Sequence, residues 1–189
     1  MRFICVLLFS ALVGCDAGRP SFQNTDITGA DYGKDFSLTD HAGRTRALAD
    51  FRGKVVVMFF GYIRCPDVCP TTLSELKAVK DQLGADGDRV QVLFVTVDPG
   101  RDTQKLLAEY VPAFESTFLG LYGDAAATAR VAKDFKVFYQ IVPGKTPESY
   151  TVDHTAGSYV FDTQGRLRLF VRHGNASSLV ADLRALLHP

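Results

Sequence analysis

One stretch of the chain is apolar at every position: Val55-Val56-Val57-Met58-Phe59-Phe60. Such a run predicts a strand that is buried on both faces of a sheet, with its side chains in the core. Downstream, Leu73, Leu76, Val79 and Leu83 recur at helical spacing before a glycine, and residues 90–97 form a second apolar run. A strand, a helix and a strand of these lengths make a βαβ unit. We therefore expect residues 55–60 and 90–97 to be parallel neighbours.

The rest of the chain alternates between strand and helix patterns. We expect helices at residues 103–110, 124–135 and 177–187, and strands at 137–142, 158–161 and 167–171. An earlier alternating segment at 36–40 leads into a turn at 41–44. The order of these elements predicts an α/β fold with a mixed sheet flanked by helices.

The length and the charge of the chain limit the number of domains and the kinds of partner that we expect. The chain has 189 residues, with 21 Lys and Arg against 21 Asp and Glu, so its formal net charge is zero. This length suits one domain. No basic excess is available to hold a phosphate backbone, so we expect no nucleic-acid partner.

The N-terminus is typical of a lipoprotein signal peptide over residues 1–14. Residues 3–13 are apolar, too few to span a bilayer, which needs about 20 apolar residues. The sequence Leu12-Val13-Gly14-Cys15 resembles a bacterial lipobox, so we expect cleavage before Cys15 and lipid on its sulfur. The competing interpretation is a plain secretory signal with a chance cysteine.

From this interpretation we expect a lipidated cysteine and flexible tether at residues 15–30 and a folded domain at 31–189. The resemblance to bacterial lipoproteins also gives Asp16 a meaning, because an aspartate after the lipidated cysteine favours retention in the inner membrane. The domain would then face the periplasm, where unprotected thiols oxidise.

Two cysteines, Cys65 and Cys69, remain for chemistry. They lie where the first buried strand ends and a helix begins, a position where α/β folds bind ligands. The positive end of the helix dipole favours the thiolate form. Three interpretations stay open: a metal pair, a redox pair and a structural disulfide, although a loop of five residues would stabilise the fold little.

The start of that helix is expected close to the cysteines. Thr72-Leu73-Ser74-Glu75 fits a capping box. Pro70 biases the residue before it, Cys69, away from α geometry, so we expect regular helix only after this point.

A third ligand would come from one of four histidines. Two thiolates and one imidazole suit copper. His41 and His173 lie in turns and His188 is beside the terminus, whereas His154 leads into an apolar strand and follows Asp153, which could orient its ring. Spacing alone does not show that His154 meets the cysteines.

Several motifs in order carry a family resemblance. The segment Phe59-Phe60-Gly61-Tyr62-Ile63-Arg64-Cys65-Pro66-Asp67-Val68-Cys69-Pro70 closely resembles the signature of the Sco/SenC copper-binding proteins. Residues 35–43, 51–54, 96–103 and 150–155 are similar to further family motifs. In two places the chain departs from the usual pattern, with Ile63 for threonine and Gly100 for glutamate; neither is a ligand position.

The resemblance implies a thioredoxin-like fold with an added N-terminal hairpin and an inserted segment before the histidine, in which residues 143–149 would lie. It implies that Cys65, Cys69 and His154 bind copper. From its place beside the histidine, we expect Asp153 either to orient the His154 ring or to make only a solvent contact at the strand end. Family members deliver copper to the dinuclear copper site of cytochrome c oxidase subunit II, or keep its thiols reduced. We therefore expect a membrane-anchored copper chaperone whose site is lost when Cys65 and Cys69 form a disulfide.

Two other functions fit the same residues. One is a metal-independent thiol–disulfide oxidoreductase, which acts through a mixed disulfide. The three-residue spacing argues against it as the sole activity, because thioredoxin-type enzymes use Cys-x-x-Cys. The other is a copper or redox sensor that signals through a partner.

Overall fold

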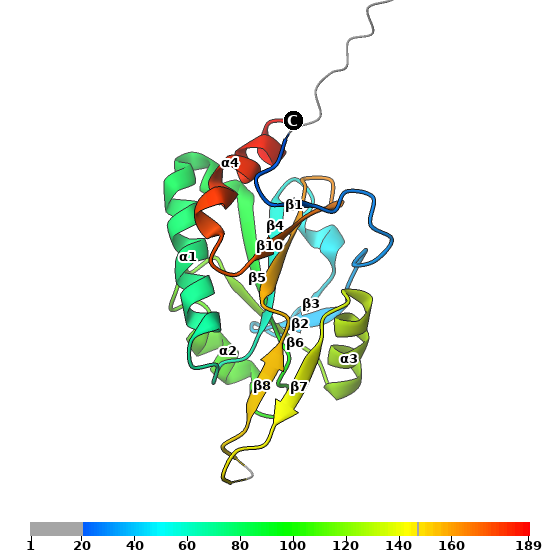
Figure 1. The fold of residues 1–189 in the computed structure, drawn as a ribbon, viewed down its shortest axis with the longest axis vertical. Coiled ribbons are helices and arrows are strands. Elements are labelled where there is room, and N and C mark those ends of the chain that lie inside the picture. Colours follow the sequence, from blue (N-terminus) through cyan, green and yellow to red (C-terminus); the bar gives the residue numbers. More distant parts are fainter. Residues whose placement is uncertain (1–20, 147) are drawn as a thin grey trace, which may run out of the picture.

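In a computed structural model of the chain, which describes residues 21–146 and 148–189, the two apolar runs are adjacent strands. Strand β4 (Val55–Gly61) pairs in parallel with β5 (Val90–Thr96), and helix α1 (Val68–Leu83) crosses between them. The predicted βαβ unit is confirmed, and its two strands lie at the centre of the sheet (Figure 1).

An eight-stranded mixed sheet is built around this unit, in the order β1-β10-β9-β4-β5-β6-β2-β3. The β4–β5 and β5–β6 pairs are parallel and the others are antiparallel. The outer strands are β1 (Thr25–Asp26), β2 (Leu38–Asp40), β3 (Thr45–Arg46), β6 (Leu119–Tyr122), β9 (Gly157–Phe161) and β10 (Leu167–Arg172). The short strand β6 was not anticipated from the sequence.

The predicted helices are present within a residue or two of their expected ends. They are α2 (Gln104–Tyr110), α3 (Ala125–Asp134) and α4 (Ala176–Leu187), with 3-10 helices η1 (Leu48–Phe51) and η2 (Gly84–Arg89). Figure 1 shows α1 and α4 side by side on one side of the sheet and α3 on the other.

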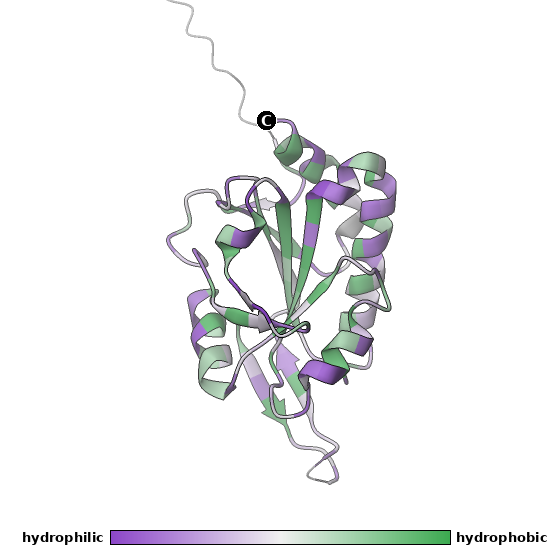
Figure 2. Cartoon of the chain, turned by 180° about the vertical axis from the view of Figure 1, so that it is seen from behind, coloured by the Kyte–Doolittle hydropathy of each residue, from purple (hydrophilic) through white to green (hydrophobic). Residues whose placement is uncertain are grey.

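Alternate side chains of β4 explain why its sequence is apolar without interruption. Phe59 packs toward Phe94 on the side of α1, with ring centroids 6.0 Å apart. The next residue, Phe60, packs against Phe135 at the end of α3, at 5.5 Å. Both faces of the central strands are therefore core, and Figure 2 shows these strands as the most hydrophobic part of the cartoon.

A separate two-stranded hairpin stands outside the main sheet. Strands β7 (Tyr139–Val142) and β8 (Thr151–His154) pair antiparallel with each other. The hairpin extends from the end of the molecule opposite to the C-terminus (Figure 1). The described residues of the predicted insertion, 143–146 and 148–149, lie at its tip.

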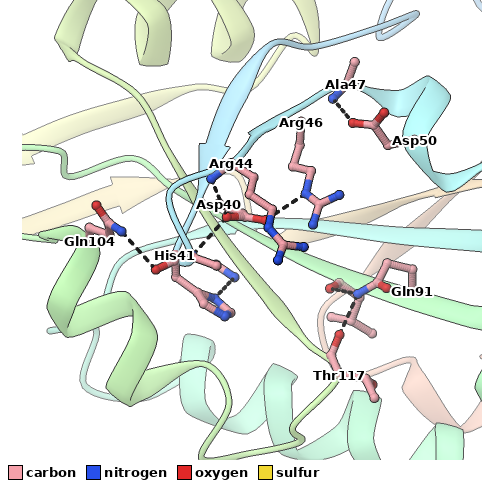
Figure 3. A network of polar contacts seen from close by, with 12 residues as sticks. Asp40, His41, Arg44, Arg46, Ala47, Asp50, Gln91, Gln104 and Thr117 are labelled. Carbon is pink, nitrogen blue, oxygen red and sulfur yellow. Dashed lines mark hydrogen bonds and ion pairs between the residues drawn. The ribbon is translucent and has the colours of Figure 1, made fainter.

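The β2–β3 hairpin is fixed by one buried carboxylate (Figure 3). Asp40 is fully buried, accepts hydrogen bonds from the N–H groups of Ala42 and Arg44, and pairs with the Arg46 guanidinium at 2.7 Å. Burial favours the neutral acid, but these donors outweigh it and hold the pKa of Asp40 below its usual value. At this edge of the sheet, the β2–β3 turn is therefore stabilised by polar contacts and not by apolar packing.

Part of the segment 15–30, which is expected to be a tether, packs on the folded domain. Residues 25–26 form β1 on the edge of the sheet, and Asn24 is buried. The Asp182 carboxylate on α4 accepts hydrogen bonds from the N–H groups of Gln23 and Asn24 and from the Asn24 amide. Polar anchoring of this kind leaves no hydrophobic pattern, so composition alone suggested a linker.

The expected signal peptide at residues 1–14 and the expected lipidation site, Cys15, lie outside the described residues. Within residues 21–146 and 148–189, no helix combines the length and the apolar character that crossing a membrane requires.

Candidate metal centre

The cysteine pair lies where β4 passes into α1. Cys65 is on the connecting loop and half-buried, whereas Cys69 is in the first turn of α1 and 0% exposed. The Cys69 N–H points at the Cys65 sulfur, 3.4 Å away. Because this N–H belongs to a helix N-terminus, it stabilises negative charge on the Cys65 sulfur.

The helix starts earlier than predicted, at Val68 instead of Thr72. Pro70 is only the third helical residue, in the turn where N–H groups have no partner within the helix, so its missing donor costs little. The expected capping box is not formed: the N-cap is Asp67, and the Thr72 hydroxyl lies 3.0 Å from Nδ1 of His173. The N-terminus of α1 therefore contains Cys69 and lies directly beside the Cys65 sulfur.

Gly61 makes room for the Cys69 sulfur at the end of β4. A Cβ at this position would lie 2.7 Å from Cys69 Sγ and 2.9 Å from the ring of Phe94. Both distances are well inside van der Waals contact. Only glycine fits here without displacing the sulfur.

The third ligand comes from the hairpin. His154 ends β8, and its Nε2 lies 3.7 Å from Cys69 Sγ. Its imidazole packs edge-on against Tyr62 and Phe59, with centroid separations of 6.0 Å and 6.2 Å. The structure thus brings together the three residues that the sequence analysis named as ligands.

The second ring nitrogen of His154 fixes its tautomer. Nδ1 lies 3.1 Å from the carbonyl oxygen of Thr155, a contact that requires a proton on Nδ1. Nε2 then keeps its lone pair and faces the sulfurs, as a ligand nitrogen must. The outer partner of the imidazole is therefore a backbone carbonyl.

Asp153, which could have oriented the His154 ring, does not contact it. It is exposed, and among the residues that the structure describes no contact joins its carboxylate to the imidazole. Adjacent residues on a strand point to opposite faces, so Asp153 and His154 face away from each other.

The two thiols share one proton unequally. A hydrogen bond from the Cys69 thiol, helped by the N–H groups of Asp67 and Cys69, lowers the pKa of Cys65 to about 5. The same hydrogen bond and burial raise the pKa of Cys69. At neutral pH the pair is one accessible thiolate beside one buried thiol.

Two further residues shape the site and were given no role from the sequence. Tyr62 covers the imidazole, and the buried Asp102 accepts a hydrogen bond from the Ile63 N–H at 3.0 Å, which fixes the loop that bears Cys65. Asp102 belongs to the 96–103 motif, which drew attention only through the family resemblance.

The donor set fits a soft metal ion. The Cys65, Cys69 and His154 ligand atoms all lie within 4.8 Å of one another. Ligands that share one ion with bonds of about 2.3 Å are at most about 4.6 Å apart, so little adjustment is needed. Two sulfurs and an imidazole suit copper. The site opens into a cavity of about 280 Å³, lined by Tyr62, Cys65, Val68, Val152 and His154 among others.

The other histidines serve different contacts. His41 Nδ1 accepts a hydrogen bond from the Gly120 N–H, and His188 pairs with Asp86 at the far end of the molecule. With the contact of His173 to Thr72, each of these rings has a local partner away from the cysteine pair.

Comparison with known proteins gives a consistent result. The sequence profile described as SCO1/SenC matches residues 24–188. The chain is 36% identical over 192 residues to the mitochondrial SCO2 homolog of Bos taurus, covering 93% of this chain and 72% of that protein. It spans between 50% and 72% of the length of the first four curated relatives.

Solved structures agree with this match. Apo Sco1 from Thermus thermophilus is 43% identical with a TM-score of 0.79, covering 88% of this chain and 98% of that one. ScoI from Bradyrhizobium japonicum, solved with copper bound, is 38% identical with a TM-score of 0.76, covering 84% and 100%. These are thioredoxin-like structures, so the expected fold is confirmed. By its profile match, its relatives and its fold, the chain belongs to the SCO1/SenC family.

Proposed function

We propose that this protein is a copper chaperone that holds one copper ion between Cys65, Cys69 and His154 and passes it to another protein. One observation carries the proposal: two sulfurs and an imidazole nitrogen from distant segments converge within 4.8 Å at the mouth of a cavity. The similarity to a copper-bound ScoI supports copper as the ion.

The uneven thiol pair suits both capture and release. Cys65 is half-exposed and already a thiolate, so it can bind an incoming ion before any proton leaves the site. Cys69 must lose its proton to bind, because only the thiolate is a good ligand. His154 lies at the end of a hairpin outside the main sheet, so an acceptor can replace the imidazole without disturbing the core.

The acceptor we propose is the dinuclear copper site of cytochrome c oxidase subunit II, the target implied by the family resemblance. We also propose that Cys15 carries lipid, that the chain is anchored in a bacterial inner membrane, and that the domain faces the periplasm. After cleavage before Cys15, the lipid on this cysteine would hold the chain at the membrane, and a short segment would connect it to the domain.

Copper transfer tests this proposal directly. The reduced protein, loaded anaerobically with one equivalent of Cu(I), is mixed with the metal-free copper domain of subunit II, and copper on each protein is measured after separation. We expect the acceptor to gain copper and the donor to lose it, while a Cys65→Ser donor transfers none. Equal transfer from free Cu(I) and from the loaded protein would contradict a chaperone role.

A second function is favoured by the same thiol pair, namely reduction of an acceptor disulfide. The Cys65 thiolate attacks one sulfur of that disulfide, giving a mixed disulfide and a released acceptor thiolate. Cys69, after losing its proton, attacks the Cys65 sulfur, so the second acceptor thiolate leaves and a Cys65–Cys69 disulfide forms. Two electrons pass to the acceptor. Reduction of oxidised subunit II without copper, counted as free thiols, distinguishes this function from copper transfer.

A further inference from the structure

The loop between β5 and α2 touches both halves of the metal centre. Asp102 binds the cysteine half through the Ile63 N–H, as described above. The residue before it, Arg101, reaches the histidine half: its guanidinium donates to the carbonyl oxygens of Tyr150 at 2.9 Å and Glu148 at 3.3 Å. Two consecutive side chains therefore join the two halves of the site.

Arg101, Asp98 and Tyr150 all contact one another, and we call these three residues the latch. Arg101 Nε pairs with Asp98 at 2.5 Å, and the guanidinium lies over the Tyr150 ring at 3.4 Å from its centroid. The Tyr150 hydroxyl donates back to Asp98 at 2.7 Å. The side chains of Arg101 and Asp98 are only 12% and 4% exposed, so water screens these charged contacts little.

The hairpin needs such a fixing point. In the described part of the chain, β7 and β8 form ladder pairs only with each other. At the base of the hairpin, Thr155 and Phe138 exchange two hydrogen bonds, and Val152 is buried. Gln140, Ile141 and Val142 are exposed. The latch holds the strand that carries His154 from the side of the tip.

We propose that Arg101 is a positioning residue for the metal centre: by holding Tyr150, it sets the β8 strand so that His154 Nε2 stays beside Cys69 Sγ. This inference rests on the proposed copper binding only for its functional consequence. The claim that Arg101 keeps β8 ordered applies to the metal-free protein and does not depend on copper binding.

Arg101 acts through geometry, not through its charge on the sulfurs. Asp98 neutralises the guanidinium through its Nε at 2.5 Å, and the Nη1 group of Arg101 donates to backbone carbonyls of the hairpin. A lysine keeps the charge but has neither the planar fork nor the stacking surface. We therefore expect Arg101→Lys to behave like Arg101→Met.

A double-mutant cycle with Cu(I) tests the functional part. Copper affinity is measured anaerobically, by competition with a chromophoric Cu(I) chelator, for the wild type, Arg101→Met, His154→Ala and the double variant. Outer-shell partners contribute about 10–100-fold to metal affinity. We expect Arg101→Met to weaken binding by about 10-fold when His154 is present, and by less than about 2-fold when it is absent. An equal loss in both backgrounds would overturn the proposal.

Arg166→Met is the matched control. Arg166 also pairs with a buried aspartate, Asp162, at 2.8 Å. It follows β9, whose Phe161 pairs with Val56 at the start of β4, so it lies at the opposite end of that strand from the cysteine loop. We expect unchanged copper affinity for this variant.

Amide hydrogen exchange of the metal-free protein tests the structural part, including the case in which Arg101→Met is generally destabilised. We expect faster exchange in Arg101→Met, and less so in Tyr150→Phe, at residues 151–154, while residues 55–61 keep wild-type protection. Equal acceleration of both segments would show general destabilisation and overturn the proposal. If wild-type copper binding proves independent of His154, the proposed function fails, and this exchange result still decides whether the latch orders β8.

Discussion

The two halves of the metal centre are built in opposite ways. The cysteine half is part of the core: it connects a fully buried strand to the helix packed on it, and Cys69 is itself a core residue. The histidine half is a hairpin outside the sheet, fixed by a few polar contacts and two aromatic rings. The two cysteine sulfurs are thus held by the core, whereas the His154 imidazole can move at a small cost in free energy.

This difference has a consequence for a protein that must bind and also release an ion. Residues embedded in the core keep their geometry whatever ligand is present, because shifting them costs packing. Segments with few buried contacts open at much lower free energy. We therefore expect changes in the cysteine half to abolish binding or unfold the domain, and changes in the histidine half to alter affinity alone.

The largest effect is expected from replacing either sulfur. Cys65→Ser and Cys69→Ser each remove one of two thiolates, and we expect Cu(I) affinity to fall by more than the about 100-fold that an outer-shell change can cause. Chelator competition and copper content after gel filtration measure this loss. A variant that keeps one copper per chain at wild-type affinity would show that the ion binds elsewhere.

The cysteine half could be located from the sequence because its signals are local. An apolar run, a glycine, two cysteines and a helical repeat follow one another, and β4, the loop and α1 inherit that order. The predicted start of α1 is wrong because a proline fits the first turn of a helix, where Pro70 lies, and does not mark its boundary.

The histidine half could not be assembled in the same way. His154 meets Cys69 only because the chain returns through β6, α3 and a hairpin, and no periodicity encodes that approach. The family resemblance supplied the residue. The latch could not be predicted either: Asp98 and Arg101 lie in the 96–103 motif and Tyr150 in the 150–155 motif, but no local pattern shows that these two motifs touch.

The next effect in size concerns the histidine. His154→Ala removes a ligand but leaves both sulfurs in place, so we expect copper affinity to fall by at least the about 10–100-fold that loss of an outer-shell partner causes, and by less than for either cysteine. The thermal midpoint of the metal-free protein should stay close to that of the wild type, because the half-exposed imidazole adds little to the core. Loss of folding on this substitution would show that the hairpin belongs to the core after all.

A smaller effect, on stability, tests how tightly the cysteine half is packed. Gly61→Ala places a methyl group 2.7 Å from Cys69 Sγ, and we expect the free energy of unfolding to fall by about 1–3 kcal/mol through overpacking. Gly100→Ala is the control, since the nearest atom to its added Cβ is 3.9 Å away. We expect a change within about 0.5 kcal/mol there. Urea denaturation of the metal-free protein compares the two, and equal changes would contradict the packing argument.

The smallest expected effect is a shift in a pH profile, and it tests the unequal sharing of the proton. Alkylation requires the thiolate, so the rate at Cys65 should fall as the pH drops through about 5, while buried Cys69 reacts slowly throughout. In Cys69→Ala the thiol that donates to Cys65 is gone, which should raise the pKa of Cys65 and move its profile to higher pH. In Cys69→Ser a hydroxyl still donates, so its profile should lie between the other two. Peptide mass spectrometry after timed alkylation gives each rate. If the alanine variant kept the wild-type profile, the Cys69 thiol would not be stabilising the Cys65 thiolate. The backbone N–H groups at the start of α1 would then account for the low pKa of Cys65 by themselves.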